Sequence, residues 1–129
     1  MSREINPPLS FTIGSSEKTF ADHRYPFVIL SIEICEILQP CFEVIRQRTG
    51  KLIDPYGAVI FSGTELEVLK EEFTAKKRLI DAALSPLQLD FGWKKCEVPA
   101  WSVSHVLQRS LDLIEIALID GKVFICDGQ

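Results

Sequence analysis

Six side chains in this sequence could perform nucleophilic or metal chemistry. They are the four cysteines and two histidines: Cys35, Cys41, Cys96, Cys126, His23 and His105. A catalytic thiol needs a neighbouring base or cation that stabilises its thiolate. Cys35 and Cys41 fall on or beside the apolar face of a predicted helix and Cys126 falls in an apolar segment, as is typical of structural cysteines. Only Cys96 has flanking charged residues that could lower its pKa, and no spacing signature accompanies it.

The spacing of the possible metal ligands and carboxylates does not indicate a reactive site. No CxxC or HxxxH pattern occurs, and Cys35 and Cys41 are six positions apart, which separates them by about 240° around a helix. Neighbouring carboxylates such as Glu71 and Glu72 fall on a predicted solvent-exposed face, where nothing raises their pKa. We therefore expect no metal, no cofactor and no catalytic residue.

The first half of the chain predicts a short strand followed by a long helix. Residues 9–13 alternate apolar and polar side chains before a glycine. From Phe27 to about Arg48 the apolar residues recur at helical spacing, although residues 28–32 could also form a strand. Pro40 lies inside this helix, and the apolar face keeps its phase across it, which favours one kinked helix over two helices.

The middle of the chain predicts a turn and a second helix. Asp54, Pro55 and Gly57 occupy favourable positions of a type I turn, so a small hairpin over 51–61 is plausible. Ser62 or Thr64 can cap a helix that continues to about Leu84. In this helix the pairs Glu72 with Lys76 and Lys77 with Asp81 have the i,i+4 spacing of ion pairs. The first half of the helix is acidic and the second half is basic.

The last third of the chain predicts a long connection, a helix and a strand. Residues 85–101 form a connection that contains both tryptophans and is partly extended. A helix then begins at Ser102 or Ser104 and ends near Asp120, with Gly121 as its C-terminal stop. The strand at 122–126 is expected to pair with residues 9–13. The fold class is therefore α+β, with three main helices and a small antiparallel sheet formed by the terminal strands and, as a further candidate, the 51–61 hairpin.

Composition limits the class of protein. The chain has 129 residues, 47% of them hydrophobic, with 18 acidic residues against 14 Lys and Arg. These values predict one globular domain over 1–129 and exclude a disordered or fibrous chain. A net charge of −4 argues against a nucleic-acid partner. The first eight residues lack the apolar core of a signal peptide, and no apolar run is long enough for a bilayer, so we expect a cytoplasmic protein with reduced thiols and no membrane contact.

Aromatic and acidic side chains are the candidate partner-binding residues. The aromatic ones are Tyr56 on the predicted turn and Trp93 and Trp101 in the long connection, and such residues are enriched at interface hot spots. Core packing is the favoured alternative for each tryptophan, because Trp is highly buried on average. The acidic candidates lie in the first half of the second helix and are Glu65, Glu67, Glu71 and Glu72.

Four segments together resemble small bacterial proteins that act as immunity partners of secreted toxins. They are the first amphipathic helix, the IDPYG turn at 53–57, the charged helix that follows it, and the last helix, which closes on DGKVFICDG at 120–128. The resemblance covers about the last three-quarters of the chain. It implies a non-catalytic cytoplasmic protein that binds and blocks a cognate toxin domain. We expect the acidic half of the second helix to face a basic cleft of that partner.

A second class of function remains open. The chain could be an enzyme or a small-molecule-binding domain with a pocket under the 85–101 connection, using His23, Cys96 or His105. A cavity lined by these residues would favour this alternative. The oligomeric state is not predicted by the sequence.

Overall fold

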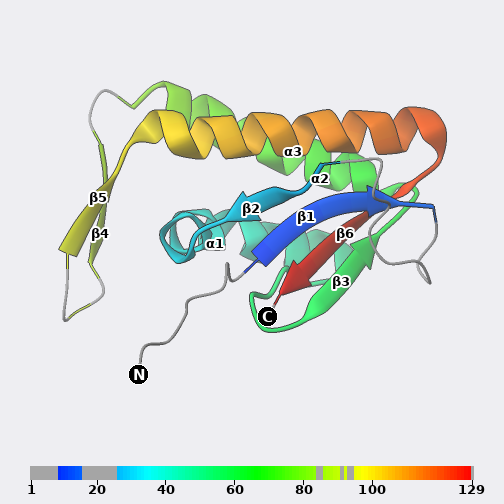
Figure 1. The fold of residues 1–129 in the computed structure, drawn as a ribbon, viewed down its shortest axis with the longest axis horizontal. Helices are drawn as coiled ribbons and strands as arrows, with labels where there is room; N and C mark the ends of the chain where they lie inside the picture. Colours follow the sequence, from blue (N-terminus) through cyan, green and yellow to red (C-terminus); the bar gives the residue numbers. More distant parts are fainter. Residues whose placement is uncertain (1–8, 16–25, 84–85, 91, 93–94, 129) are drawn as a thin grey trace.

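The computed structural model describes residues 9–15, 26–83, 86–90, 92 and 95–128. Within these ranges three helices pack with a four-stranded antiparallel sheet, which confirms the predicted α+β class. The helices are α1 (Ile32–Thr49), α2 (Glu65–Asp81) and α3 (Ala100–Asp120), and the sheet has the order β2 (Val28–Leu30), β1 (Leu9–Gly14), β6 (Val123–Gly128), β3 (Ala58–Phe61). Figure 1 shows α2 and α3 running alongside each other above the sheet, with α1 behind it.

The terminal strands form the centre of the sheet, as the sequence predicts. β1 and β6 pair antiparallel from Leu9 opposite Gly128 to Gly14 opposite Val123. Their side chains that face the helices are fully buried, and the Phe11 ring lies 6.0 Å from the ring of Phe73 of α2 and 5.1 Å from that of Phe124 of β6. Aromatic contacts between β1, β6 and α2 therefore connect the sheet to the helices.

The hairpin expected over 51–61 is wrong, although its turn is confirmed. The Gly57 amide donates to the Asp54 carbonyl at 3.2 Å, and the Tyr56 amide donates to the Asp54 side chain at 2.9 Å. Residues 51–54 form no strand, and Ile53 is fully buried in the core. Residues 58–61 instead form β3, which pairs with β6.

Helix ends differ from the expected positions by a few residues, each for a local reason. The first helix begins at Ile32 rather than Phe27 because 28–30 pairs with β1 as β2, and Ser31 caps it by accepting a hydrogen bond from the Ile34 amide at 3.2 Å. It continues through Pro40 as one helix, as expected. The last helix begins at Ala100, just after Pro99, and ends at Gly121 in the left-handed conformation, with φ 67°.

The second helix begins after Thr64 without a side-chain cap. The hydroxyls of Ser62 and Thr64 were the expected caps, but the Glu65 carboxylate accepts the Ser62 amide at 3.0 Å instead. This helix ends at Asp81, short of the expected Leu84, which lies outside the described residues.

The 85–101 connection contains a second, two-stranded sheet. β4 (Leu87–Asp90) and β5 (Lys95–Val98) pair antiparallel, with Leu89 opposite Cys96 on a half-buried face. Figure 1 shows this hairpin projecting from the body at the end where α3 begins. Among the residues placed by the structure, no helix combines the length and apolar character needed to cross a bilayer.

Candidate functional site

Burial makes three of the four cysteines poor nucleophiles. Cys35, Cys41 and Cys126 are buried, as expected for structural cysteines. Burial, with a smaller contribution from Glu36, raises the pKa of Cys35 to about 12, and burial likewise raises the pKa of Cys126 well above its usual range. The Cys41 thiol donates a weak hydrogen bond to the backbone carbonyl of Glu72, with 3.7 Å between sulfur and oxygen. These thiols remain protonated at neutral pH.

The structure does not test the pocket expected under the 85–101 connection, because part of that connection and His23 lie outside the described residues. Cys96 is half-buried in β5, and His105 is exposed on α3. The two cavities that we describe below are lined by other residues. Across residues 9–15, 26–83, 86–90, 92 and 95–128, no group of three or more His, Cys, Asp or Glu side chains is arranged to hold a metal ion.

Two cations occupy most of the predicted acidic surface on α2. Arg48 of α1 donates to Glu71 and to Glu72, both at 2.8 Å, so one guanidinium joins α1 to α2. Lys51 donates to Glu65 at 2.9 Å and to the Ile60 carbonyl of β3 at 2.7 Å. Hence three of the four acidic candidates are paired.

The remaining acidic candidate is Glu67, which is exposed on α2. Glu65 and Glu72 are only partly exposed, in contrast to the expected open acidic face. The expected pair of Glu72 with Lys76 is wrong, because Glu72 contacts Arg48 instead, whereas the pair of Lys77 with Asp81 is confirmed at 2.8 Å. A shallow cavity lies along this side of α2 and is lined by Glu67, Lys70, Glu71, Thr74, Ala75 and Arg78.

The aromatic candidates are exposed wherever the structure describes them. Trp101 has 72% of its surface exposed, so the core position favoured for it is wrong, and Tyr56 on its turn is 82% exposed. Trp93 lies outside the described residues. Figure 1 shows the turn before β3 at the lower edge of the molecule and the beginning of α3 above it, next to the β4–β5 hairpin.

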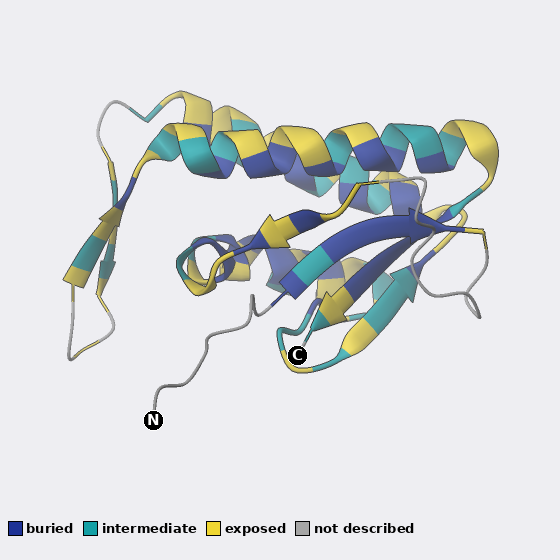
Figure 2. Ribbon diagram, in the orientation of Figure 1, coloured by how far each residue is buried: buried dark blue, intermediate teal, exposed yellow. Residues whose placement is uncertain are grey.

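Trp101 begins a continuous exposed face of α3. The following residues at helical spacing, His105, Gln108 and Arg109, are all exposed. Figure 2 shows exposed residues, in yellow, alternating with buried residues, in dark blue, along α3. Arg109 donates to the backbone carbonyl of Phe27 at 3.5 Å, which brings β2 next to this face. We call Trp101, His105, Gln108 and Arg109 the α3 face.

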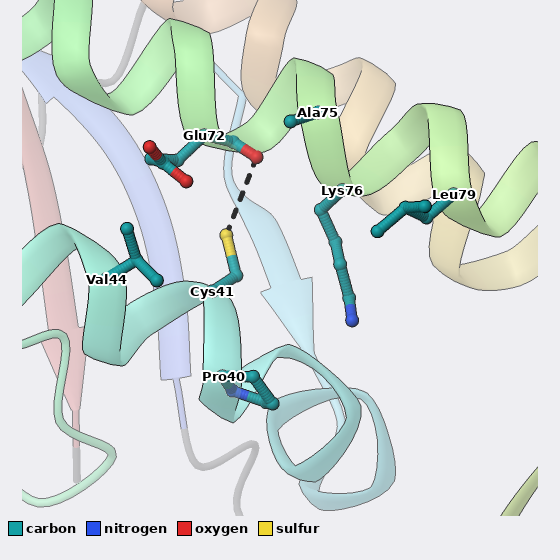
Figure 3. Close-up of a pocket in the computed structure, with 7 residues that line it drawn as sticks. All are labelled: Pro40, Cys41, Val44, Glu72, Ala75, Lys76 and Leu79. Atoms are coloured by element: carbon teal, nitrogen blue, oxygen red, sulfur yellow. Dashed lines mark hydrogen bonds between the residues drawn. The ribbon is translucent and has the colours of Figure 1, made fainter.

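The structure also contains a groove that was not predicted from the sequence. It lies between α1 and α2, has a volume of about 190 Å³, and has mostly apolar walls (Figure 3). Pro40 and Val44 of α1 stand opposite Ala75 and Leu79 of α2. The only sequence signal was that Val44 and Leu79 are apolar residues outside the buried stripes of their helices, which does not indicate that they lie opposite each other.

Comparison with known proteins identifies no relatives: the chain matches no protein-family model, and no curated protein and no solved structure is significantly similar to it.

Proposed function

We propose that this chain is a non-catalytic protein-binding module of the immunity type, which neutralises a cognate toxin by covering part of its surface. The observation that carries the proposal is the exposure of Trp101 on a rigid helix. Large aromatic side chains that stay in solvent on an ordered element are typical anchors of protein interfaces. The buried, protonated thiols support a role that does not depend on nucleophilic catalysis.

The packing of α3 on the core supports the proposal, because it holds Trp101 in place before binding. The opposite side of α3 is buried in the core through Val103, Val106 and Leu107. A preorganised helix loses little conformational entropy when a partner binds. His105, Gln108 and Arg109 follow the aromatic side chain along the same face, and an aromatic anchor with polar neighbours is the usual composition of an interface with a polar rim.

The residue just before β2 extends the proposed interface. Phe27 is partly exposed beside the Arg109 contact, and Arg109 lies eight residues after Trp101, about 12 Å along the helix. The proposed surface therefore runs from Trp101 to the β2 edge. We assign the acidic half of α2 a smaller role than the sequence suggests, because three of its four carboxylates already have a cation partner.

The test is co-expression with the product of the gene beside this one, under conditions in which that product alone stops growth. The wild-type chain should restore growth, and Trp101→Ala should restore it less. The control is Ile119→Ala, because Ile119 is 78% exposed at the other end of the same helix. Failure of the wild-type chain to protect cells from a toxic neighbour, or a neighbour without toxicity, would contradict the immunity role.

A further inference from the structure

The groove between α1 and α2 is large enough to hold one side chain of a binding partner. Its volume of about 190 Å³ is below the roughly 300 Å³ at which pockets begin to accept whole drug-sized ligands. Its rims are apolar, and Leu79 and Val44 keep 69% and 37% of their surface exposed. The groove can therefore take one aromatic or branched side chain and bury additional apolar surface on both helices.

The charges around the groove favour a carboxylate in its occupant. Figure 3 shows the Lys76 side chain extending from α2 across the groove, and no carboxylate of the described residues lies within ion-pair distance of it. The other charged lining residue is Glu72, whose carboxylate is bound to Arg48. Between them lies the Cys41 thiol, whose pKa is raised to about 12 chiefly by burial, so it adds no negative charge. Among the residues placed by the structure, Lys76 is therefore the charged lining residue without an ion-pair partner.

We propose that the α1–α2 groove receives one aromatic or branched side chain of a protein partner, with a carboxylate of the same segment bound to Lys76. This inference rests on the proposed function, because it adds a second contact to the same partner. A protein segment is favoured over a free small molecule because the groove is open and small. Such a site holds a single side chain well only when the rest of an interface contributes to binding.

The experiment uses phenylacetate as a probe, because it combines one ring with one carboxylate and needs no knowledge of the partner. Titration into the isotope-labelled protein should shift the amide resonances of residues that line the groove, with a dissociation constant of about 1–10 mM. Lys76→Gln should weaken phenylacetate binding about fivefold. Benzyl alcohol, which has no charge, should bind the wild type and Lys76→Gln equally.

A steric variant provides the second measurement. Ala75 is exposed and lines the groove, so Ala75→Trp should fill it and abolish the phenylacetate shifts without removing core contacts. The matched control is Ala58→Trp on β3, also an exposed alanine but outside the groove, which should leave phenylacetate binding unchanged.

Three results would overturn the inference. Absence of groove shifts at about 50 mM phenylacetate, well above the expected dissociation constant, would exclude the site. Micromolar phenylacetate affinity would make a free small acid the ligand. Shifts of the same resonances on raising the protein concentration alone would make a second copy of the chain the occupant. None of these measurements involves the toxin, so they fail or succeed independently of the growth test.

Discussion

At the scale of single residues, the four thiols differ in their solvent exposure. Burial raises the pKa of Cys35 and Cys41 to about 12, with small contributions from nearby glutamates, whereas Cys96 is half-buried on the β4–β5 hairpin. At pH 8, iodoacetamide should therefore alkylate Cys96 in the folded protein and reach the other thiols only after unfolding in urea. Mass spectrometry of peptides checks this pattern. Rapid labelling of Cys41 in the folded protein would contradict it.

The Lys51–Glu65 contact makes stability depend on pH. Partial burial acts to raise the pKa of Glu65, but hydrogen bonds from Lys51 and from the Ser62 amide outweigh it, and the pKa is lowered. A carboxyl group with a lowered folded-state pKa contributes stability above its unfolded pKa of about 4.3, and loses it as the pH falls through the folded value.

Replacing this carboxylate should therefore destabilise the protein only when it would be charged. Glu65→Gln should lower the free energy of unfolding by about 0.5–1 kcal/mol at pH 7, because neutral hydrogen bonds replace charged ones near the surface. The difference should shrink toward zero below about pH 4. Urea unfolding at pH 7, 5 and 3 measures it, with Glu67→Gln as the exposed control. A difference that stays constant with pH would refute this account of Glu65.

At the scale of elements, α2 packs on the sheet through Phe73. This side chain is fully buried and stacks on Phe11 of β1, with 19° between the ring planes. Phe73→Ala should lower the free energy of unfolding by about 3–4 kcal/mol, because it leaves a cavity in the core. Leu79→Ala on the same helix should change it by less than about 0.5 kcal/mol, because Leu79 is largely exposed. Equal losses in chemical denaturation would show that α2 does not dock as described.

Helical periodicity predicted the three helices, and glycine stops predicted the ends of α1 and α3, because these signals are local. The buried apolar face of α3 and its C-terminal cap at Gly121 are both determined by residues that are close together in the sequence. The start of α1 was misplaced because 28–30 has an apolar pattern that fits either a helix or a strand, and pairing with β1 decides between them. The 51–61 hairpin failed for the same reason: β6 offers residues 58–61 a partner that local patterns do not reveal.

At the scale of the whole molecule, most of what defines the candidate surfaces lies between segments distant in sequence. Arg48 is 24 residues from Glu72, so the pairing of these acidic residues with a cation of α1 could not be predicted from spacing within α2. The groove between α1 and α2 likewise exists only after the two helices pack. The exposure of Trp101 was missed because the last helix was expected to begin at Ser102 or Ser104, which left Trp101 to the average burial of tryptophan. The helix begins at Ala100 instead, and its spacing then places Trp101 on the polar side with His105, Gln108 and Arg109.

The central proposal is that Trp101 anchors a protein partner, and titration calorimetry with the purified product of the neighbouring gene, the proposed partner, tests it most directly. Trp101→Ala should raise the dissociation constant about 30-fold or more, as for an interface hot spot, while Ile119→Ala should change it less than about fivefold. Circular dichroism of both variants should match the wild type, because both side chains are exposed. A Trp101→Ala protein that binds the proposed partner as tightly as the wild type would contradict the account.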